Sequence, residues 1–211
     1  ASQLGRSPSS IALKLVNFAH LDPALRARGV QGMGHVSALD REVAVAFASD
    51  WDAAIAETST EWSTVDEEPL PNEPVGPSEV TANVKVRLTQ RFFRRAVLSA
   101  YDSACCICGI SPHYLLFASH IMPWASAPEH RSDPRNGLAL CALHDKAFDA
   151  GQLTILPNFV VEVSSSLLTA SDVPVAKAAF RDLHGSSMTL PSRFLPSPDF
   201  LQYHNAKVFK D

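Results

Sequence analysis

Two stretches of the sequence decide the fold, ASHIMPW at residues 118–124 and NGLALCALHDKAFDAG at residues 136–151. In the first stretch, His120 ends an apolar run that starts at Leu115. In the second, the short apolar run at residues 138–140 leads into a segment with helical spacing. The pattern predicts strand, loop, strand and helix. A single histidine at a strand end is usually structural, but His120, Asn136 and His144 at these three places together indicate a functional site.

The cysteines of the chain are clustered around these stretches. Cys105 and Cys108 form a C-x-x-C step that is followed by a glycine, and Cys141 and His144 form a second pair at the same spacing. Two thiolates at this spacing can bind one metal ion from a tight turn. A secreted disulfide scaffold would spread its cysteines along the chain. We therefore predict a closed tetrahedral zinc site that staples a small subdomain. The alternative is a set of buried thiols that act as small hydrophobic side chains.

These residues resemble the motif of the HNH endonuclease family, and most closely its bacterial restriction-type branch. The resemblance covers about residues 84–155. It rests on the segments ASHIMPW (118–124), NGL (136–138), LHD (143–145) and FDAG (148–151). It implies an α+β protein with a ββα-metal subdomain. It also implies a metal-dependent nuclease that hydrolyses phosphodiester bonds and leaves 5′-phosphate ends.

The resemblance also implies roles for individual residues. His120, as a neutral imidazole, would be the general base that takes a proton from the attacking water. Asn136 would hold the loop and orient His120, or would give an oxygen to the catalytic metal ion. A Mg²⁺ ion, or another divalent cation such as Mn²⁺ or Ni²⁺, would bind the scissile phosphate and stabilise the departing 3′ oxygen.

The sequence departs from the family pattern at the residue before His120. Many members of the family carry an aspartate or histidine there as a metal ligand, whereas this chain has Ser119. The catalytic ion would then depend on Asn136, His144 or Asp145. His144 is a candidate ligand for either ion, because it can complete the zinc site or bind the catalytic ion. We favour zinc on His144 and the catalytic ion near Asp145.

Charge is distributed unevenly along the chain. Residues 1–80 hold 5 basic and 12 acidic residues, residues 81–152 hold 8 and 5, and residues 153–211 hold 5 of each. The only positive segment is therefore the one that carries the motifs, and local potential steers a polyanion more than net charge does. An ordinary solvated surface explains this small excess equally well. The candidates for phosphate contacts are Lys85, Arg87, Arg91, Arg94, Arg95, Arg131 and Arg135.

The chain is predicted to contain three parts: a helical N-terminal unit at residues 1–60, an acidic, proline-bearing linker at residues 61–82, and a nuclease domain at residues 83–211 with its core motif at 105–151. The expected elements are helices at 7–16 and 37–56, a short alternation and then a helix at 84–101, a hairpin at 153–163, and helices at 173–183 and 198–209.

Three functions remain open from the sequence. The first is an endonuclease of restriction or genome defence that cuts double-stranded DNA; it could act as a homodimer, because double-strand cutting by a one-site nuclease often needs two copies. The second is a zinc-stapled DNA-binding module with a degenerate catalytic centre, which Ser119 favours. The third is a nuclease for RNA or single strands. The chain has no apolar run of the ~18 residues that span a bilayer and no secretory pattern at residues 1–13, so a cytoplasmic location is expected.

Overall fold

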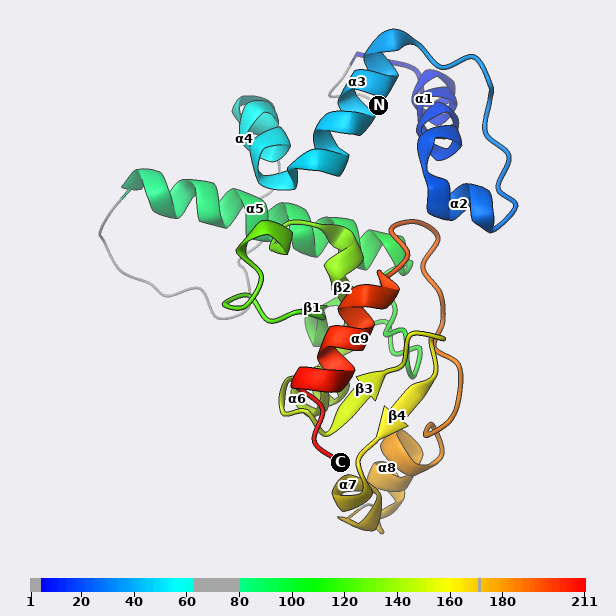
Figure 1. Cartoon of the computed structure of the whole chain (residues 1–211), viewed down its shortest axis with the longest axis vertical. Coiled ribbons are helices and arrows are strands. Elements are labelled where there is room, and N and C mark those ends of the chain that lie inside the picture. The colour runs from blue at the N-terminus through cyan, green and yellow to red at the C-terminus, as the bar shows by residue number, and fades with distance from the viewer. Residues whose placement is uncertain (1–4, 63–79, 171) are drawn as a thin grey trace. The chain divides into compact units, whose positions relative to one another are not determined.

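The computed structural model describes residues 5–62, 80–170 and 172–211, with only the backbone described for residues 24, 56, 59–62 and 80–88 (Figure 1). The chain divides into two compact units, residues 1–54 and 55–211. Helices and short antiparallel strand pairs make it an α+β protein, as predicted. The predicted linker falls mostly on residues 63–79, outside the described residues, so the domain boundaries at 60 and 82 stay a prediction.

The N-terminal unit is built from the helices α1 (Pro8–Leu21), α2 (Pro23–Ala27) and α3 (Ala38–Ser49), and α4 (Trp51–Trp62) follows directly. The prediction of one helix over residues 37–56 was wrong, because the chain turns out of the helix at Asp50 (φ −155°, ψ 101°). The carboxylate of Asp50 accepts the backbone N–H of Ala53 at 2.9 Å and so caps the start of the next helix.

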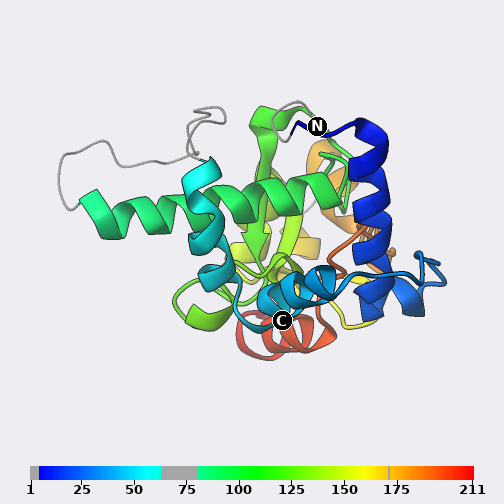
Figure 2. The same ribbon diagram turned by 90° about the horizontal axis from the view of Figure 1, so that it is seen from above.

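The second unit contains α5 (Val80–Ala100), which is a single helix throughout. The alternation of Val84, Val86 and Leu88 therefore lies within a helix. The expected change from an alternating segment to a helix within residues 84–101 does not occur. Figure 2 shows α5 lying across the pair of strands β1 and β2. A methyl group in place of the Gly137 hydrogen would come within 2.3 Å of Cγ2 of Val97, so only glycine allows this close approach.

The two motif stretches form the predicted strand, loop, strand and helix. β1 (Leu116–His120) pairs antiparallel with β2 (Gly137–Cys141), and α6 (Ala142–Asp149) follows β2 without a break. In the register of this pair, His120 lies opposite Gly137. The connections carry three short 3₁₀ helices, η1 (His113–Leu115), η2 (Pro128–His130) and η3 (Pro134–Asn136).

The C-terminal part contains the predicted hairpin, as β3 (Leu153–Ile155) and β4 (Val161–Val163). The helix expected over residues 173–183 is instead a short α8 (Pro174–Ala176) that continues as a π-helical turn, η4 (Lys177–Arg181). The remaining helices are α7 (Ser165–Ala170) and α9 (Pro198–Lys207). None of the helices in the described ranges is long and apolar enough to cross a membrane.

One core joins these elements, because α5, β1, β2, α6, β3 and α9 all contribute fully buried side chains to it. Its largest members include Phe148, Leu116, Leu140, Ile155 and Leu201. The C-terminal segment is part of this core. The backbone N–H of Lys210 donates to the carbonyl of Gly151 at 2.8 Å, which holds the end of the chain against the turn after α6.

His204 in α9 should make the stability of this core depend on pH. It is 1% exposed, stacks on Phe148 with ring centroids 3.7 Å apart, and places Nδ1 2.8 Å from Oγ1 of Thr154. Burial lowers the pKa of His204 to about 4. Between pH 6.5 and 4 the unfolded chain therefore binds a proton that the folded chain does not, so folding free energy is lost as the pH falls through this range.

From this shift we expect His204 alone to reduce the free energy of unfolding by about 2 kcal/mol between pH 7 and pH 5. Urea denaturation at the two pH values measures the loss, and the variant His204→Gln should show a correspondingly smaller pH dependence. An equal loss in both proteins would mean that His204 is not the group responsible.

Candidate functional site

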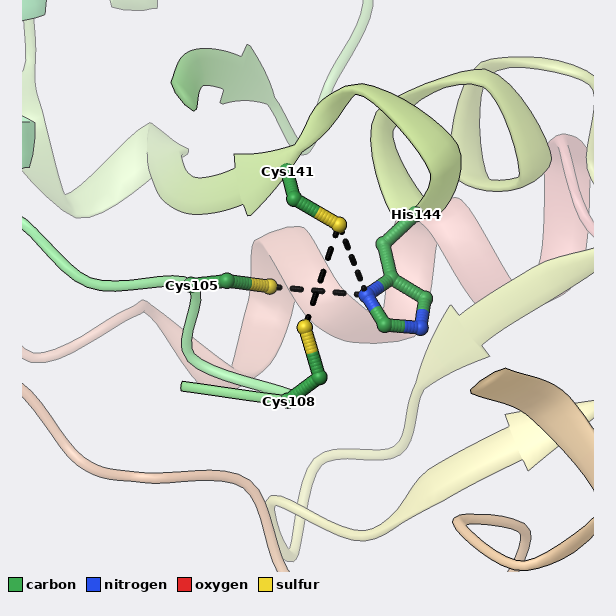
Figure 3. A group of neighbouring side chains, drawn as sticks. All are labelled: Cys105, Cys108, Cys141 and His144. Carbon is green, nitrogen blue, oxygen red and sulfur yellow. Dashed lines mark hydrogen bonds between the residues drawn. The ribbon is translucent and has the colours of Figure 1, made fainter. Parts of the chain in front are cut away.

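The two cysteine-containing pairs come together at one point (Figure 3). Cys105 and Cys108 lie on a tight turn that Gly109 completes with φ +75°, and the N–H of Cys106 donates to the carbonyl of Ala139 in β2 at 2.8 Å. Cys141 is the last residue of β2 and the N-cap of α6. His144 is the third residue of that helix, so the C-x-x-H spacing places both side chains on the same side of its first turn.

The spacing of the four ligand atoms fits a tetrahedral metal site. Sγ of Cys108 and Sγ of Cys141 are 3.8 Å apart, and Nδ1 of His144 lies 3.3 Å from Sγ of Cys141 and 3.4 Å from Sγ of Cys105. Around zinc, bond lengths of ~2.3 Å to sulfur and ~2.0 Å to nitrogen give about 3.8 Å between two sulfurs and about 3.5 Å between sulfur and nitrogen. All four ligand atoms lie within 4.8 Å of one another. The residues therefore form a Cys₃His group that can bind a metal ion.

A backbone carbonyl holds His144 in the orientation that such a site needs. Nε2 of His144 lies 2.8 Å from the carbonyl oxygen of Ala179, which can only accept, so Nε2 carries the proton and Nδ1 presents its lone pair to the sulfurs. Ala179 belongs to η4. Its carbonyl is available because the N–H groups of Leu183 and His184 both donate to Phe180 instead. The two ring nitrogens of His144 are thus engaged, which favours the zinc role over the catalytic-ion role.

The fourth cysteine of the chain lies outside this group. Cys106 is buried, and burial, followed by the nearby sulfur of Cys105, raises the pKa of its thiol well above the usual value. In contrast, the hydrogen bond with Cys141 lowers the pKa of the Cys105 thiol and favours the thiolate that a metal ion requires. Cys106 therefore packs as a small hydrophobic side chain.

Successive side chains of β1 face opposite sides of the strand pair. Ser119 faces α6, where its hydroxyl donates to Oδ1 of Asp145 at 2.5 Å. His120 faces α5, where its ring stacks on Phe93 with centroids 3.9 Å apart and planes 6° apart. The position before the histidine, where Ser119 departs from the family pattern, is therefore in direct contact with the carboxylate on α6.

His120 is held as a neutral imidazole. Its Nε2 lies 2.8 Å from the carbonyl oxygen of Arg131, so Nε2 must carry the proton and Nδ1 the lone pair. Among the described residues, Nδ1 makes no hydrogen bond. Burial lowers the pKa of His120, and the positive charge of Arg131 acts in the same direction, while the hydrogen bond opposes them. The ring is therefore uncharged at neutral pH and can accept a proton.

Asn136 is 0% exposed and holds the loop that joins the two strands. Its Oδ1 accepts the N–H of Met122 at 2.8 Å, and its Nδ2 donates to the carbonyls of Met122 at 3.3 Å and His130 at 3.1 Å. Because the amide is buried and engaged with the backbone, this geometry favours the loop-holding role over that of a metal ligand.

Two carboxylates share one face of α6, since Asp145 and Asp149 are separated by one helical turn. Asp145 is 5% exposed, and Nζ of Lys146 lies 3.5 Å from its Oδ2 and 3.7 Å from Oδ2 of Asp149. Burial raises the pKa of Asp149, and the charge of Asp145 raises it further. Asp149 was not among the predicted site residues, although its i, i+4 spacing from Asp145 was a usable signal.

The predicted phosphate-binding residues divide into three groups. Arg95 on α5 is exposed, whereas Arg91 and Arg94 are half-buried and Nη1 of Arg94 donates to the carbonyl of Leu116 at 2.9 Å. On the loop, Arg135 makes a two-pronged contact with the buried Asp133, at 2.6 Å from Nη2 and 3.0 Å from Nε, and Arg131 lies against Trp124. The side chains of Lys85 and Arg87 lie outside the described residues.

The comparisons with known proteins bear on the segment just described. Residues 105–156 match the model of the HNH endonuclease family, and no curated protein matches the chain. The matched segment runs from the first cysteine of the Cys₃His group through β1, β2 and α6 to the end of β3. The resemblance found in the two motif stretches is thus confirmed: residues 105–156 of this chain are similar to the HNH endonuclease family.

Proposed function

We propose that this chain is a metal-dependent endonuclease that hydrolyses phosphodiester bonds of double-stranded DNA. The observation that carries the proposal is the state of His120, a neutral imidazole within the matched segment whose Nε2–H is held by a carbonyl and whose Nδ1 keeps its lone pair. A general base needs this arrangement at neutral pH. The match of residues 105–156 to the HNH endonuclease family supports a nuclease, and the duplex DNA substrate is our inference.

In the proposed mechanism, Nδ1 of His120 takes the proton from the attacking water. The hydrogen bond from Nε2 to the carbonyl of Arg131 strengthens as the ring becomes charged, because a carbonyl stabilises a cationic donor. Phe93 covers one face of the ring and limits its rotation. Asn136 keeps the loop, and with it the Arg131 carbonyl, at the end of β1.

We assign the catalytic divalent ion, Mg²⁺, Mn²⁺ or Ni²⁺, to the carboxylate pair of α6. Asp145 and Asp149 offer hard oxygen ligands on one helix face, and the hydroxyl of Ser119 occupies Oδ1 of Asp145. When bound, the ion supplies Lewis-acid stabilisation of charge on the phosphate and the departing oxygen. This keeps the predicted ligand Asp145, adds Asp149, and leaves Asn136 to hold the loop.

We assign zinc to the Cys₃His group as a structural ion. The group joins the turn at Cys105 to the junction of β2 and α6, and it has four protein ligands with no open position. Closed four-ligand sites of this type are structural, whereas catalytic zinc sites keep a position open. Reduced cysteines of this kind are typical of the cytoplasm, where we place the protein, in a restriction or genome-defence role.

A zinc-stapled DNA-binding module is the second candidate function. Ser119 favours it, because a hydroxyl that already donates to Asp145 is a poor metal ligand. A plasmid assay distinguishes the nuclease from the DNA-binding module. Supercoiled plasmid is incubated with the full chain and Mg²⁺, Mn²⁺ or Ni²⁺, with EDTA as the control. Nicked or linear plasmid only with the ions supports the nuclease. Plasmid that is shifted on the gel but intact supports the DNA-binding module. If the chain cleaves only RNA or single-stranded nucleic acid, those are its substrates and duplex DNA is not.

The carboxylate pair gives a prediction about metal affinity. Replacement of a residue that only supports a metal ligand already weakens metal binding by about 10–100-fold. Asp145→Asn, which removes a proposed ligand, should therefore weaken Mn²⁺ binding by more than this, and Asp149→Asn should weaken it less. Electron paramagnetic resonance of free Mn²⁺ measures both. The exposed Asp182 provides the control, as Asp182→Asn. Unchanged affinity in both α6 variants would remove the pair as the ion site.

A further inference from the structure

The loop between β1 and β2, residues 121–136, is closed at two points. Asn136 closes its base through the backbone of Met122. The second closure is made by Arg131, whose Nε donates to the carbonyl of Trp124 at 2.8 Å. The guanidinium carbon of Arg131 lies 4.8 Å from the centroid of the Trp124 ring, so the same side chain also covers the indole.

This second closure is in direct contact with His120. The Trp124 ring meets the imidazole edge-on, with centroids 5.4 Å apart and planes 83° apart. The carbonyl of Arg131 accepts the Nε2 proton. Together with the stack on Phe93, three contacts fix the imidazole, and two of them come from the pair of residues that the guanidinium joins.

We propose that Arg131 is a positioning residue for His120. By binding Trp124, its guanidinium holds both the Arg131 carbonyl and the indole edge against the imidazole, so that Nδ1 is the nitrogen presented to water. The proposal rests on the proposed function, in which His120 is the base. It also gives Arg131 a role that differs from the phosphate contact predicted from the sequence.

The two roles differ in what they require of the side chain. A phosphate contact needs a positive charge, which lysine also supplies. The closure on Trp124 needs a planar group that lies on the indole while a nitrogen in the same plane donates to the carbonyl, and lysine lacks this geometry. Arg131→Lys therefore separates positioning from charge, and Arg131→Met removes both.

The first measurement is independent of activity. In the full chain, nuclear magnetic resonance of ¹⁵N-labelled protein follows exchange of the His120 Nε2 proton with water. We expect exchange about fivefold to tenfold faster in both Arg131→Met and Arg131→Lys, because one hydrogen bond that keeps the loop closed is lost. Arg181→Met is the matched control, since Arg181 also donates to a backbone carbonyl, that of Leu168 at 2.7 Å, away from His120.

The second measurement is DNA cleavage under saturating substrate. We expect kcat to fall about tenfold or more in both variants, as misplacement of a reacting group predicts, with KM nearly unchanged in Arg131→Lys. Wild-type exchange of the Nε2 proton in both variants, or a wild-type kcat in Arg131→Lys, would overturn the proposal. So would the unfolding of both variants, which would make Arg131 a structural residue. A chain that cleaves no DNA would contradict the proposed function, while the exchange rates would still decide the role of Arg131.

Discussion

Replacement of His120 by alanine is expected to lower the single-turnover rate of DNA cleavage by about 10²–10⁴-fold, the usual contribution of a general base. The neutral ring and the lone pair on Nδ1 are lost, while the carboxylates of α6 and the Cys₃His group are left in place. Quenched-flow or manual sampling with enzyme in excess over a labelled duplex measures the rate.

DNA binding in EDTA and the melting temperature should stay near those of the wild-type chain, because His120 is only half-buried. His113→Ala is the matched control, since this histidine is exposed and lies before β1. Addition of imidazole to His120→Ala should restore part of the rate. Full activity in His120→Ala would remove this residue as the base.

The second large effect is expected from the Cys₃His group. We expect metal analysis to find one zinc ion per chain in the wild-type protein. The double variant Cys105→Ser/Cys108→Ser should lose this ion, and residues 55–211 should then no longer fold stably. Structural zinc contributes about 10–16 kcal/mol in small domains at neutral pH, which is as large as the total stability of most domains, about 5–15 kcal/mol.

Metal analysis, together with circular dichroism melting before and after a strong chelator, measures both effects. Cys106→Ala is the matched control because Cys106 is buried in the same turn but lies outside the ligand group, so it should keep its zinc. Wild-type protein that contains no zinc and melts normally would contradict the zinc site. Cys105, Cys108 and Cys141 would then be thiols that pack as small hydrophobic side chains.

The sequence predicted the parts of the site whose spacing is local. The C-x-x-C and C-x-x-H pairs, the strand that ends in His120 and the helix after Cys141 each follow from patterns within about five residues. The match of residues 105–156 to the HNH endonuclease family then agrees with the resemblance carried by those same segments.

Contacts between distant residues could not be predicted in this way. Nothing in the spacing indicates that Ala179 in a π-helical turn would orient His144, or that Ser119 would donate to Asp145. The alternation at Val84–Leu88 suggested something other than helix, yet the backbone is helical from Val80 onward. No metal role was predicted for Asp149, because residues 149–151 fit the end of a helix in which Gly151 takes the left-handed cap.

The central claim is that this chain hydrolyses DNA in a reaction that needs a divalent metal ion and uses His120 as the general base. It is tested most directly by the ends formed when the full chain, with Mg²⁺ or Mn²⁺, is incubated with a labelled duplex. We expect 5′-phosphate and 3′-hydroxyl ends, seen as fragments that a polymerase can extend, and no such fragments when EDTA is present. Intact duplex with every divalent ion, at concentrations where the chain binds DNA, would contradict it.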